Sequence, residues 1–108
     1  MKTSLFLLAG LFIAANTQAA DLKGNLKTGK TLAYTCSGCH GIAEYKNAYP
    51  SYRVPKIAGQ NEKYLLAALQ GYKKGERNHP TMKAQAASYS DQDIADIAAY
   101  ISSLKPKK

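Results

Sequence analysis

The sequence places two thiols and an imidazole within five consecutive residues, at Cys36, Cys39 and His40. On a helical turn, positions i, i+3 and i+4 share one face, so both sulfurs and the imidazole can meet one flat ligand. C-x-x-C-H is the attachment signature of c-type haem. In that chemistry each thiol forms a thioether with a haem vinyl group, and the histidine binds the iron from the proximal side. The motif therefore predicts one covalently bound haem c.

Other interpretations of the same motif have to be weighed. A C-x-x-C pair also occurs in redox disulfides and zinc sites, but a zinc site needs a second pair of ligands, and only His79 remains among the cysteines and histidines. A thioredoxin-like site also needs a βαβ context, and no stretch of the chain alternates as a strand does. A chance match with a purely structural role stays open on the motif alone.

The first twenty residues have the pattern of a targeting segment. Lys2 supplies a positive start, residues 5–15 form an apolar core, and residues 16–20 are small and polar, as at a cleavage site. An uncleaved membrane anchor is the alternative, but the apolar run is short for a transmembrane span. We expect residues 1–20 to be a cleaved signal peptide and residues 21–108 to be one haem-binding domain in the periplasm, with no stable membrane insertion after cleavage. In an oxidising compartment two free cysteines tend to form a disulfide, whereas haem attachment occupies both thiols. Export therefore agrees with the haem interpretation.

The charge balance is strongly basic, with 15 Lys and Arg against 7 Asp and Glu and a net charge of +8. A surface this basic predicts partners with acidic docking surfaces. Nucleic acid is the competing inference, but the lysines are dispersed, no nucleic-acid-binding motif is present, and the chain is predicted to be exported. We expect redox proteins as partners and no nucleic acid.

Helical periodicity dominates the rest of the chain and predicts an all-α fold. Trp is absent and both Phe residues lie in the targeting segment, so a haem would supply apolar bulk that a small core lacks. A tyrosine- and lysine-rich loop between Gly41 and Gly59 is broken by two prolines. The predicted helices run from the N-cap Asn25 into the cysteine motif, from about Asn61 to Lys73 with Gly75 as a stop, and from a capping-box-like Ser90 and Asp93 to a stop at Pro106.

Sequence blocks in a fixed order resemble the small bacterial class I c-type cytochromes, close to the cytochrome c553 and single-domain cytochrome c4-like group. The resemblance implies the cytochrome c fold, a small helical domain around one haem, with the first and last helices crossing near Gly29 and Tyr100. The blocks are Gly29-Lys30-x-Leu32-Ala33, Cys36-x-x-Cys39-His40-Gly41, Pro55-Lys56-Ile57-Ala58-Gly59-Gln60, Tyr64-Leu65, Gly75-Glu76-Arg77, Met82, Ser90-Asp91-x-Asp93-Ile94 and Ala98-Ala99-Tyr100.

The same resemblance implies the remaining site residues. Met82 corresponds to the second axial ligand, opposite His40, and the carbonyl of Pro55 corresponds to the acceptor of the proximal histidine's other N–H. A methionine that fills a core and an ordinary loop proline are the bland alternatives. Further haem-pocket residues are expected at Ile57, Tyr64 and Leu69, with Tyr72 and Tyr64 equally explained as core residues or hydroxyl donors.

Two features stand apart from this pattern. His79 lies three residues before Met82 and could bind iron itself, although a histidine in a polar loop beside a proline is more often solvated. The Ile42–Val54 loop departs from the glycine-rich turn of close relatives, either as a docking feature or as a variable loop.

The predicted function is that of a periplasmic monohaem electron carrier, with iron cycling between Fe(II) and Fe(III), and not that of an enzyme. Two filled axial positions leave no open site for oxygen or peroxide. Two alternatives remain: a dedicated haem c subunit of a periplasmic dehydrogenase or oxidase, and a ligand-binding haem enzyme with a displaceable sixth ligand.

Overall fold

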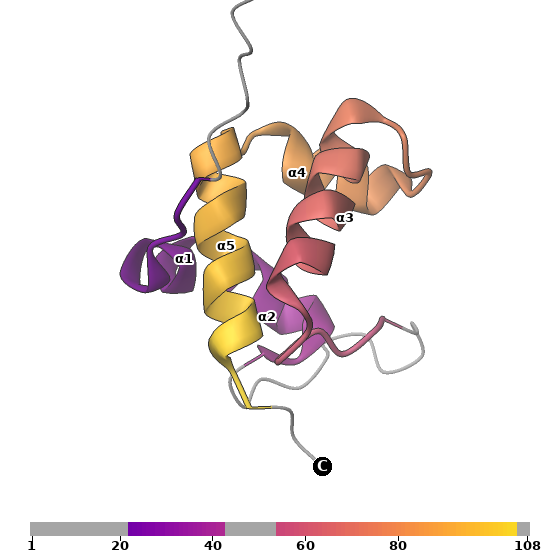
Figure 1. Ribbon diagram of the computed structural model, residues 1–108. Helices are drawn as coiled ribbons and strands as arrows, with labels where there is room; N and C mark the ends of the chain where they lie inside the picture. The colour runs from indigo at the N-terminus through magenta and orange to yellow at the C-terminus, as the bar shows by residue number, and fades with distance from the viewer. Residues whose placement is uncertain (1–21, 43–53, 106–108) are drawn as a thin grey trace, which may run out of the picture.

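The computed structural model describes residues 22–42 and 54–105, in which all regular structure is helical, as predicted. The predicted signal peptide and most of the Ile42–Val54 loop lie outside these residues. The helices are α1 Leu26–Leu32, α2 Tyr34–His40, α3 Glu62–Lys74, α4 Pro80–Ala87 and α5 Asp91–Ser103. Figure 1 shows α3 and α5 side by side, with α1 packed on another side of α5.

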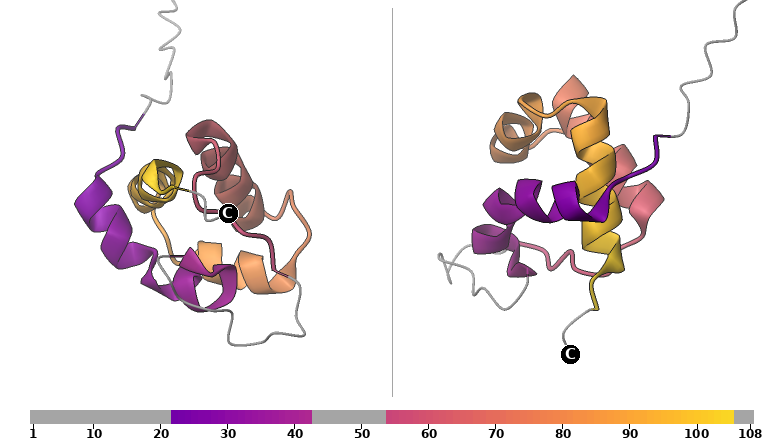
Figure 2. Two further views of the ribbon diagram at one scale, coloured as in Figure 1. Left: turned by 90° about the horizontal axis from the view of Figure 1, so that it is seen from below. Right: turned by 90° about the vertical axis from the view of Figure 1, so that its left-hand side faces the viewer.

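Helices α1 and α5 cross in close contact, as the family resemblance implies (Figure 2). The crossing is set by Gly29, because a Cβ there would lie 2.0 Å from the carbonyl oxygen of Asp96 and 2.8 Å from the Cβ of Tyr100. Only a residue without a side chain fits at that distance. The terminal parts of the domain are thus fastened to each other at one point.

The helix predicted to run from Asn25 through the cysteine motif is divided in two. Asn25 caps α1 as expected, accepting hydrogen bonds from the backbone of Lys27 and Thr28. Ala33 then forms a turn between α1 and α2, and Gly41 ends α2 in a left-handed conformation with φ of 64°. The break sets the direction of α2, the helix that carries both thiols and the imidazole.

The other two predicted helices are present, and Gly75 and the capping box at Ser90 and Asp93 have the roles that the sequence predicts. Asn61 accepts a hydrogen bond from the backbone N–H of Tyr64 at the start of α3, and Gly75 ends that helix with φ of 80°. Ser90 and Asp93 form a capping box at the start of α5, which ends at Ser103, before the predicted stop at Pro106.

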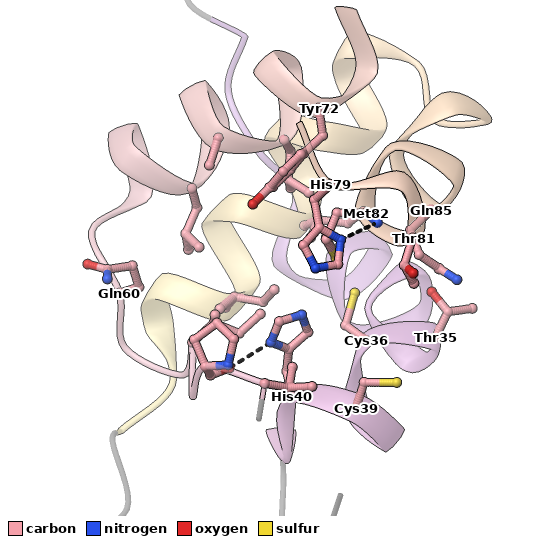
Figure 3. A pocket seen from close by; sticks show the side chains of 18 of the residues that line it. Thr35, Cys36, Cys39, His40, Gln60, Tyr72, His79, Thr81, Met82 and Gln85 are labelled. Carbon is pink, nitrogen blue, oxygen red and sulfur yellow. Dashed lines mark hydrogen bonds between the residues drawn. The ribbon is translucent and has the colours of Figure 1, made fainter. Parts of the chain in front are cut away.

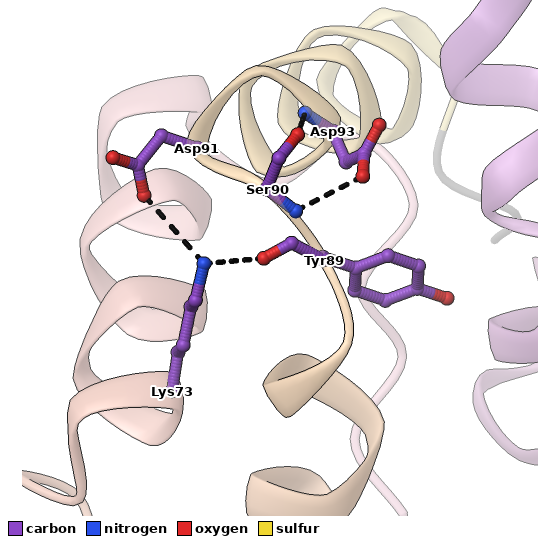
Figure 4. Close-up of polar contacts among 5 residues, drawn as sticks. All are labelled: Lys73, Tyr89, Ser90, Asp91 and Asp93. Atoms are coloured by element: carbon purple, nitrogen blue, oxygen red, sulfur yellow. Dashed lines mark hydrogen bonds and ion pairs between the residues drawn. The ribbon is translucent and has the colours of Figure 1, made fainter.

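A polar contact joins the end of α3 to the start of α5 (Figure 4). The ammonium group of Lys73 donates to the carbonyl oxygen of Tyr89 and lies 3.9 Å from a carboxylate oxygen of Asp91. Because Tyr89 directly precedes the capping box, this contact fixes where α5 begins relative to α3.

Helix α4 was not among the predicted helices, because His79 and the following proline favour a polar loop. Pro80 occupies the first turn, where its missing N–H costs nothing, and His79 caps the helix with its side chain. An imidazole is not among the usual capping groups, so the sequence gives little warning of a helix start here. Met82 therefore lies on the first turn of a helix.

The core is small and made of aliphatic side chains. Ile42, Ile94, Ile97 and Ile101 are the largest fully buried residues. Cys36, Ile57 and Leu69 are partly buried against this core, which places the cysteine motif beside it. In the part of the chain that the structure describes, no helix has both the length and the apolar character needed to cross a membrane.

Candidate haem-binding site

A cavity of about 630 Å³ lies between α2, α3, α4 and the segment that follows residue 53. Its size is typical of a pocket for a drug-sized ligand or cofactor. Every site residue expected from the sequence lines this one cavity: Cys36, Cys39, His40, Pro55, Ile57, Tyr64, Leu69 and Met82.

His40 lies at the end of α2 and is held in one orientation. Its Nδ1 lies 2.7 Å from the carbonyl oxygen of Pro55, the contact that the family resemblance implies. A carbonyl only accepts, so Nδ1 carries a proton and Nε2 is the nitrogen left to bind a metal. Figure 3 shows this ring turned into the cavity. Histidine binds metals as a neutral imidazole, through one ring nitrogen, while the other ring nitrogen donates a hydrogen bond.

The two thiols lie on the same wall of the cavity as His40 (Figure 3). Cys36 is partly buried, Cys39 is exposed, and both are free thiols. Burial raises the pKa of the Cys36 thiol, a hydrogen bond with Thr35 lowers it, and the nearby Cys39 raises it again. Burial disfavours a charged thiolate at Cys36, and a thioether carries no charge. Covalent attachment therefore suits this partly buried sulfur. The C-x-x-C-H residues thus fit a haem c by position and by access.

Met82 lies on α4, across the cavity from α2. Its side chain is partly buried and lines the cavity, and its backbone N–H donates to Nδ1 of His79 at 3.3 Å. The cap on α4 therefore holds the residue expected to bind iron. A thioether sulfur is a soft ligand atom, which suits the axial role that the family resemblance implies for Met82.

His79 is not the solvated loop residue that the sequence analysis favours. It is partly buried, caps α4, lines the cavity, and packs edge-on against Tyr72 with ring centroids 6.2 Å apart. The sequence could not indicate this, because the expected loop is a helix start.

Arg77 lines the cavity as well, and the sequence analysis did not select it. Its guanidinium lies over the ring of Tyr72 at 4.7 Å and is within 5.9 Å of the Tyr64 ring. A hydrogen bond with the Tyr64 hydroxyl raises the pKa of Arg77, so the group stays cationic. The side chain crosses Gly71, where an added Cβ would approach it to 3.1 Å. The glycine at position 71, inside α3, was the one signal for this arrangement.

The apolar wall was foreseen only in part. The apolar faces of α3 and α5 line the cavity through Leu65, Ile97 and Ile101. The faces expected to form the core therefore also form part of the pocket. Tyr89 lies on the same wall and its hydroxyl is 2.9 Å from the Thr35 hydroxyl, next to Cys36. Among residues 22–42 and 54–105, no three His, Cys, Asp or Glu side chains gather into a metal site of their own.

A small all-α domain with C-x-x-C-H on the wall of a mostly apolar cavity defines a covalent haem protein. Residues 26–105 match the cytochrome c family. The chain belongs to this family, and its cofactor is a covalently bound haem c. The architecture described above is the cytochrome c fold.

Individual relatives agree with this assignment. Cytochrome c4 of Pseudomonas aeruginosa is 40% identical over 105 residues, which are 97% of this chain and 48% of that protein. Cytochrome c-553 of Helicobacter pylori is 32% identical over 97% of this chain and 100% of its own length. The cytochrome subunit of sulfide dehydrogenase of Chlorobaculum tepidum is 33% identical over 73% of this chain and 68% of its own length. The chain spans about half the length of the cytochromes c4 that it matches.

Proposed function

We propose that this protein is an exported monohaem cytochrome c that carries single electrons between redox proteins, with His40 and Met82 as its axial ligands. The observation that supports the proposal is one cavity lined by a histidine on α2, whose Nδ1 is hydrogen-bonded to the carbonyl of Pro55, and by a methionine on α4. When bound, haem c supplies the reversible one-electron Fe(III)/Fe(II) couple.

The chain's own residues suit carriage better than catalysis. His40 and Met82 together would fill both axial positions, so no site remains for a substrate at the iron. The hydrogen bond from His40 to Pro55 keeps the imidazole from rotating when the charge on the metal changes. A methionine ligand also favours a raised reduction potential compared with a second histidine.

The axial ligands are tested on purified holoprotein. Ferric haem bound to methionine sulfur has a weak charge-transfer band in the red, which we expect in the wild type and expect to be lost in Met82→Ala. The reduction potential should fall in the same variant, because the thioether no longer stabilises the ferrous state. A wild type without the red band, or a variant that keeps the band, would remove Met82 from the site.

Covalent attachment and export are tested by mass. We expect the periplasmic protein to begin after residue 19 or 20 and to exceed the mass of residues 21–108, or 20–108, by one haem. Acid-acetone extraction should leave the colour with the polypeptide. A retained N-terminus, or haem that extracts freely, would contradict this part of the proposal.

A second candidate function is that of a dedicated subunit docked on a periplasmic dehydrogenase. It is supported by the similarity to the cytochrome subunit of sulfide dehydrogenase in Chlorobaculum tepidum. The fold and site would be the same in both cases, so the test is association. Size-exclusion chromatography of native periplasm should show the haem at the mass of the free protein; co-elution with a dehydrogenase activity would favour the subunit.

A further inference from the structure

His79 both caps α4 and lines the cavity. Its Nδ1 accepts the backbone N–H of Met82 at 3.3 Å, and its ring lines the cavity. Figure 3 shows the rings of His79 and His40 turned toward each other across the cavity, each with its second nitrogen pointing into the space between them.

Capping alone does not explain an imidazole at this position. Ser, Thr, Asp and Asn are the preferred N-cap residues, and their short side chains reach the same backbone N–H. A histidine cap is weaker, but it adds a second nitrogen that extends beyond the cap. In this structure that nitrogen belongs to the cavity wall beside Met82.

The position of the proton separates two states of His79. While Nδ1 accepts from Met82, the neutral ring carries its proton on Nε2, and a protonated nitrogen cannot bind a metal. If Nε2 binds a metal, the proton must move through solvent to Nδ1, which then cannot accept the Met82 N–H. The ring keeps one proton in both states. Because Nδ1 cannot carry that proton and accept the Met82 N–H at once, the capped and metal-binding states of His79 exclude each other.

The same exchange involves Met82 directly. Helix α4 is eight residues long, and Met82 lies on its first turn, which the cap stabilises. Loss of the cap frees the N–H of Met82 and loosens the turn that presents its sulfur. The capped state therefore holds Met82 toward the cavity, and the uncapped state releases Met82 while making His79 available.

We propose that His79 is a second ligand for the haem iron, held back by its cap on α4 and taking the sixth position whenever Met82 does not occupy it. The inference rests on the proposed His40 and Met82 ligation. The sequence contains only two histidines, and the other is His40. His79 is thus the one imidazole that this chain can offer on the distal side.

The test uses three holoprotein variants: Met82→Ala, His79→Asn, and the two combined. Asparagine keeps a capping oxygen and removes the imidazole, so it separates the two roles of His79. We expect Met82→Ala to lose the red sulfur band and to remain low-spin, with electron paramagnetic resonance of a bis-imidazole haem and no binding of carbon monoxide to the ferrous form. The double variant should become high-spin and bind carbon monoxide, and His79→Asn alone should keep the wild-type spectrum.

A high-spin, carbon-monoxide-binding Met82→Ala indistinguishable from the double variant would overturn the proposal. Met82→Leu, which preserves the side-chain volume, is measured in parallel so that loss of folding in the alanine variant does not decide the result. A wild type without the sulfur band that becomes high-spin in His79→Asn alone would overturn both the Met82 ligation and the reserve role of His79. The two proposals therefore fail in different ways.

Discussion

Asp96 is the buried carboxylate that ties the N-terminal segment to α5. Its side chain is only 3% exposed, and Oδ1 accepts from the backbone N–H of Asn25 at 2.7 Å and from the Gln92 amide at 2.8 Å. Both donors lose this acceptor in Asp96→Ala, which should lower the free energy of unfolding by about 1–3 kcal/mol. Thermal unfolding of the holoprotein measures the loss.

The control for this prediction is Asp96→Asn. Asparagine keeps an oxygen near the Asn25 N–H, so it should retain more stability than alanine does. Equal losses for alanine and asparagine would show that the negative charge, and not the hydrogen bond, is what stabilises the contact.

At the scale of single residues, the sequence indicates chemistry best where the residues are consecutive. Cys36, Cys39 and His40 could be found because haem attachment requires them close together in the chain. The positions of Arg77 and His79 could not, because each depends on what a different helix places next to it. Arg77 lies on Tyr72 through a close approach to Gly71, and that approach exists only in the folded protein.

The crossing of α1 and α5 gives a prediction at the scale of elements. In Gly29→Ala the new Cβ would overlap the Asp96 carbonyl, which lies 2.0 Å away, and backbone cannot move aside as a flexible side chain can. The helices must separate, so the free energy of unfolding should fall by about 3 kcal/mol.

Gly38→Ala is the matched control, because Gly38 is also helical and has no neighbour within 4 Å of a new Cβ. That substitution should be neutral or stabilising by up to about 1 kcal/mol, from helix propensity alone. Chemical denaturation of the two variants compares them directly, and a similar loss in both would mean that the crossing is looser than the structure indicates.

The capping box of α5 gives a smaller effect. In Ser90→Ala the backbone N–H of Asp93 loses its acceptor at 3.0 Å, and about 1 kcal/mol of stability should be lost. Ser90→Asp should keep most of it, since aspartate is an equally good cap. If the Ser90→Ala and Ser90→Asp variants both unfold at the wild-type temperature, the contact of Lys73 with Tyr89 is enough to hold the start of α5.

Helices with local signals were predicted well, and those set by tertiary packing were not. Asn61, Gly75 and Ser90 act within one or two turns of themselves, so their effect on α3 and α5 can be read along the chain. The turn at Ala33 and the helix α4 have no such signal. Ala33 is a good helix former whose turn directs α2 toward the cavity, and this direction depends on packing.

At the scale of the whole molecule, the net charge of +8 is a property of the sequence, but its arrangement is not. Lys56 and Arg77 both line the cavity, so positive charge lies beside the site where electrons would enter and leave. Lys46 and Arg53, two basic residues of the Ile42–Val54 loop, lie outside the described residues. Lys56 is therefore the position at which the effect of local charge can be tested.

We expect electron transfer to an acidic redox protein to slow as ionic strength rises. Long-range attraction increases the rate of encounter, and the Debye length falls from about 10 Å at 0.1 M salt to about 3 Å at 1 M. Stopped-flow measurement of the bimolecular rate against salt concentration, with an acidic redox protein as the reaction partner, gives this dependence. A rate that does not change with salt would remove electrostatic steering from the proposed function.

Local and overall charge are separated by two charge reversals of equal size. Lys56→Glu and Lys105→Glu change the net charge by the same amount, but Lys56 lines the cavity and Lys105 follows α5 near the C-terminal end. If the partner approaches the cavity, Lys56→Glu should slow the reaction several-fold at low salt and Lys105→Glu much less, and the two rates should converge at high salt as screening removes the difference. Equal slowing by both variants would mean that overall charge attracts the partner, because a docking surface at the cavity requires the nearer lysine to matter more.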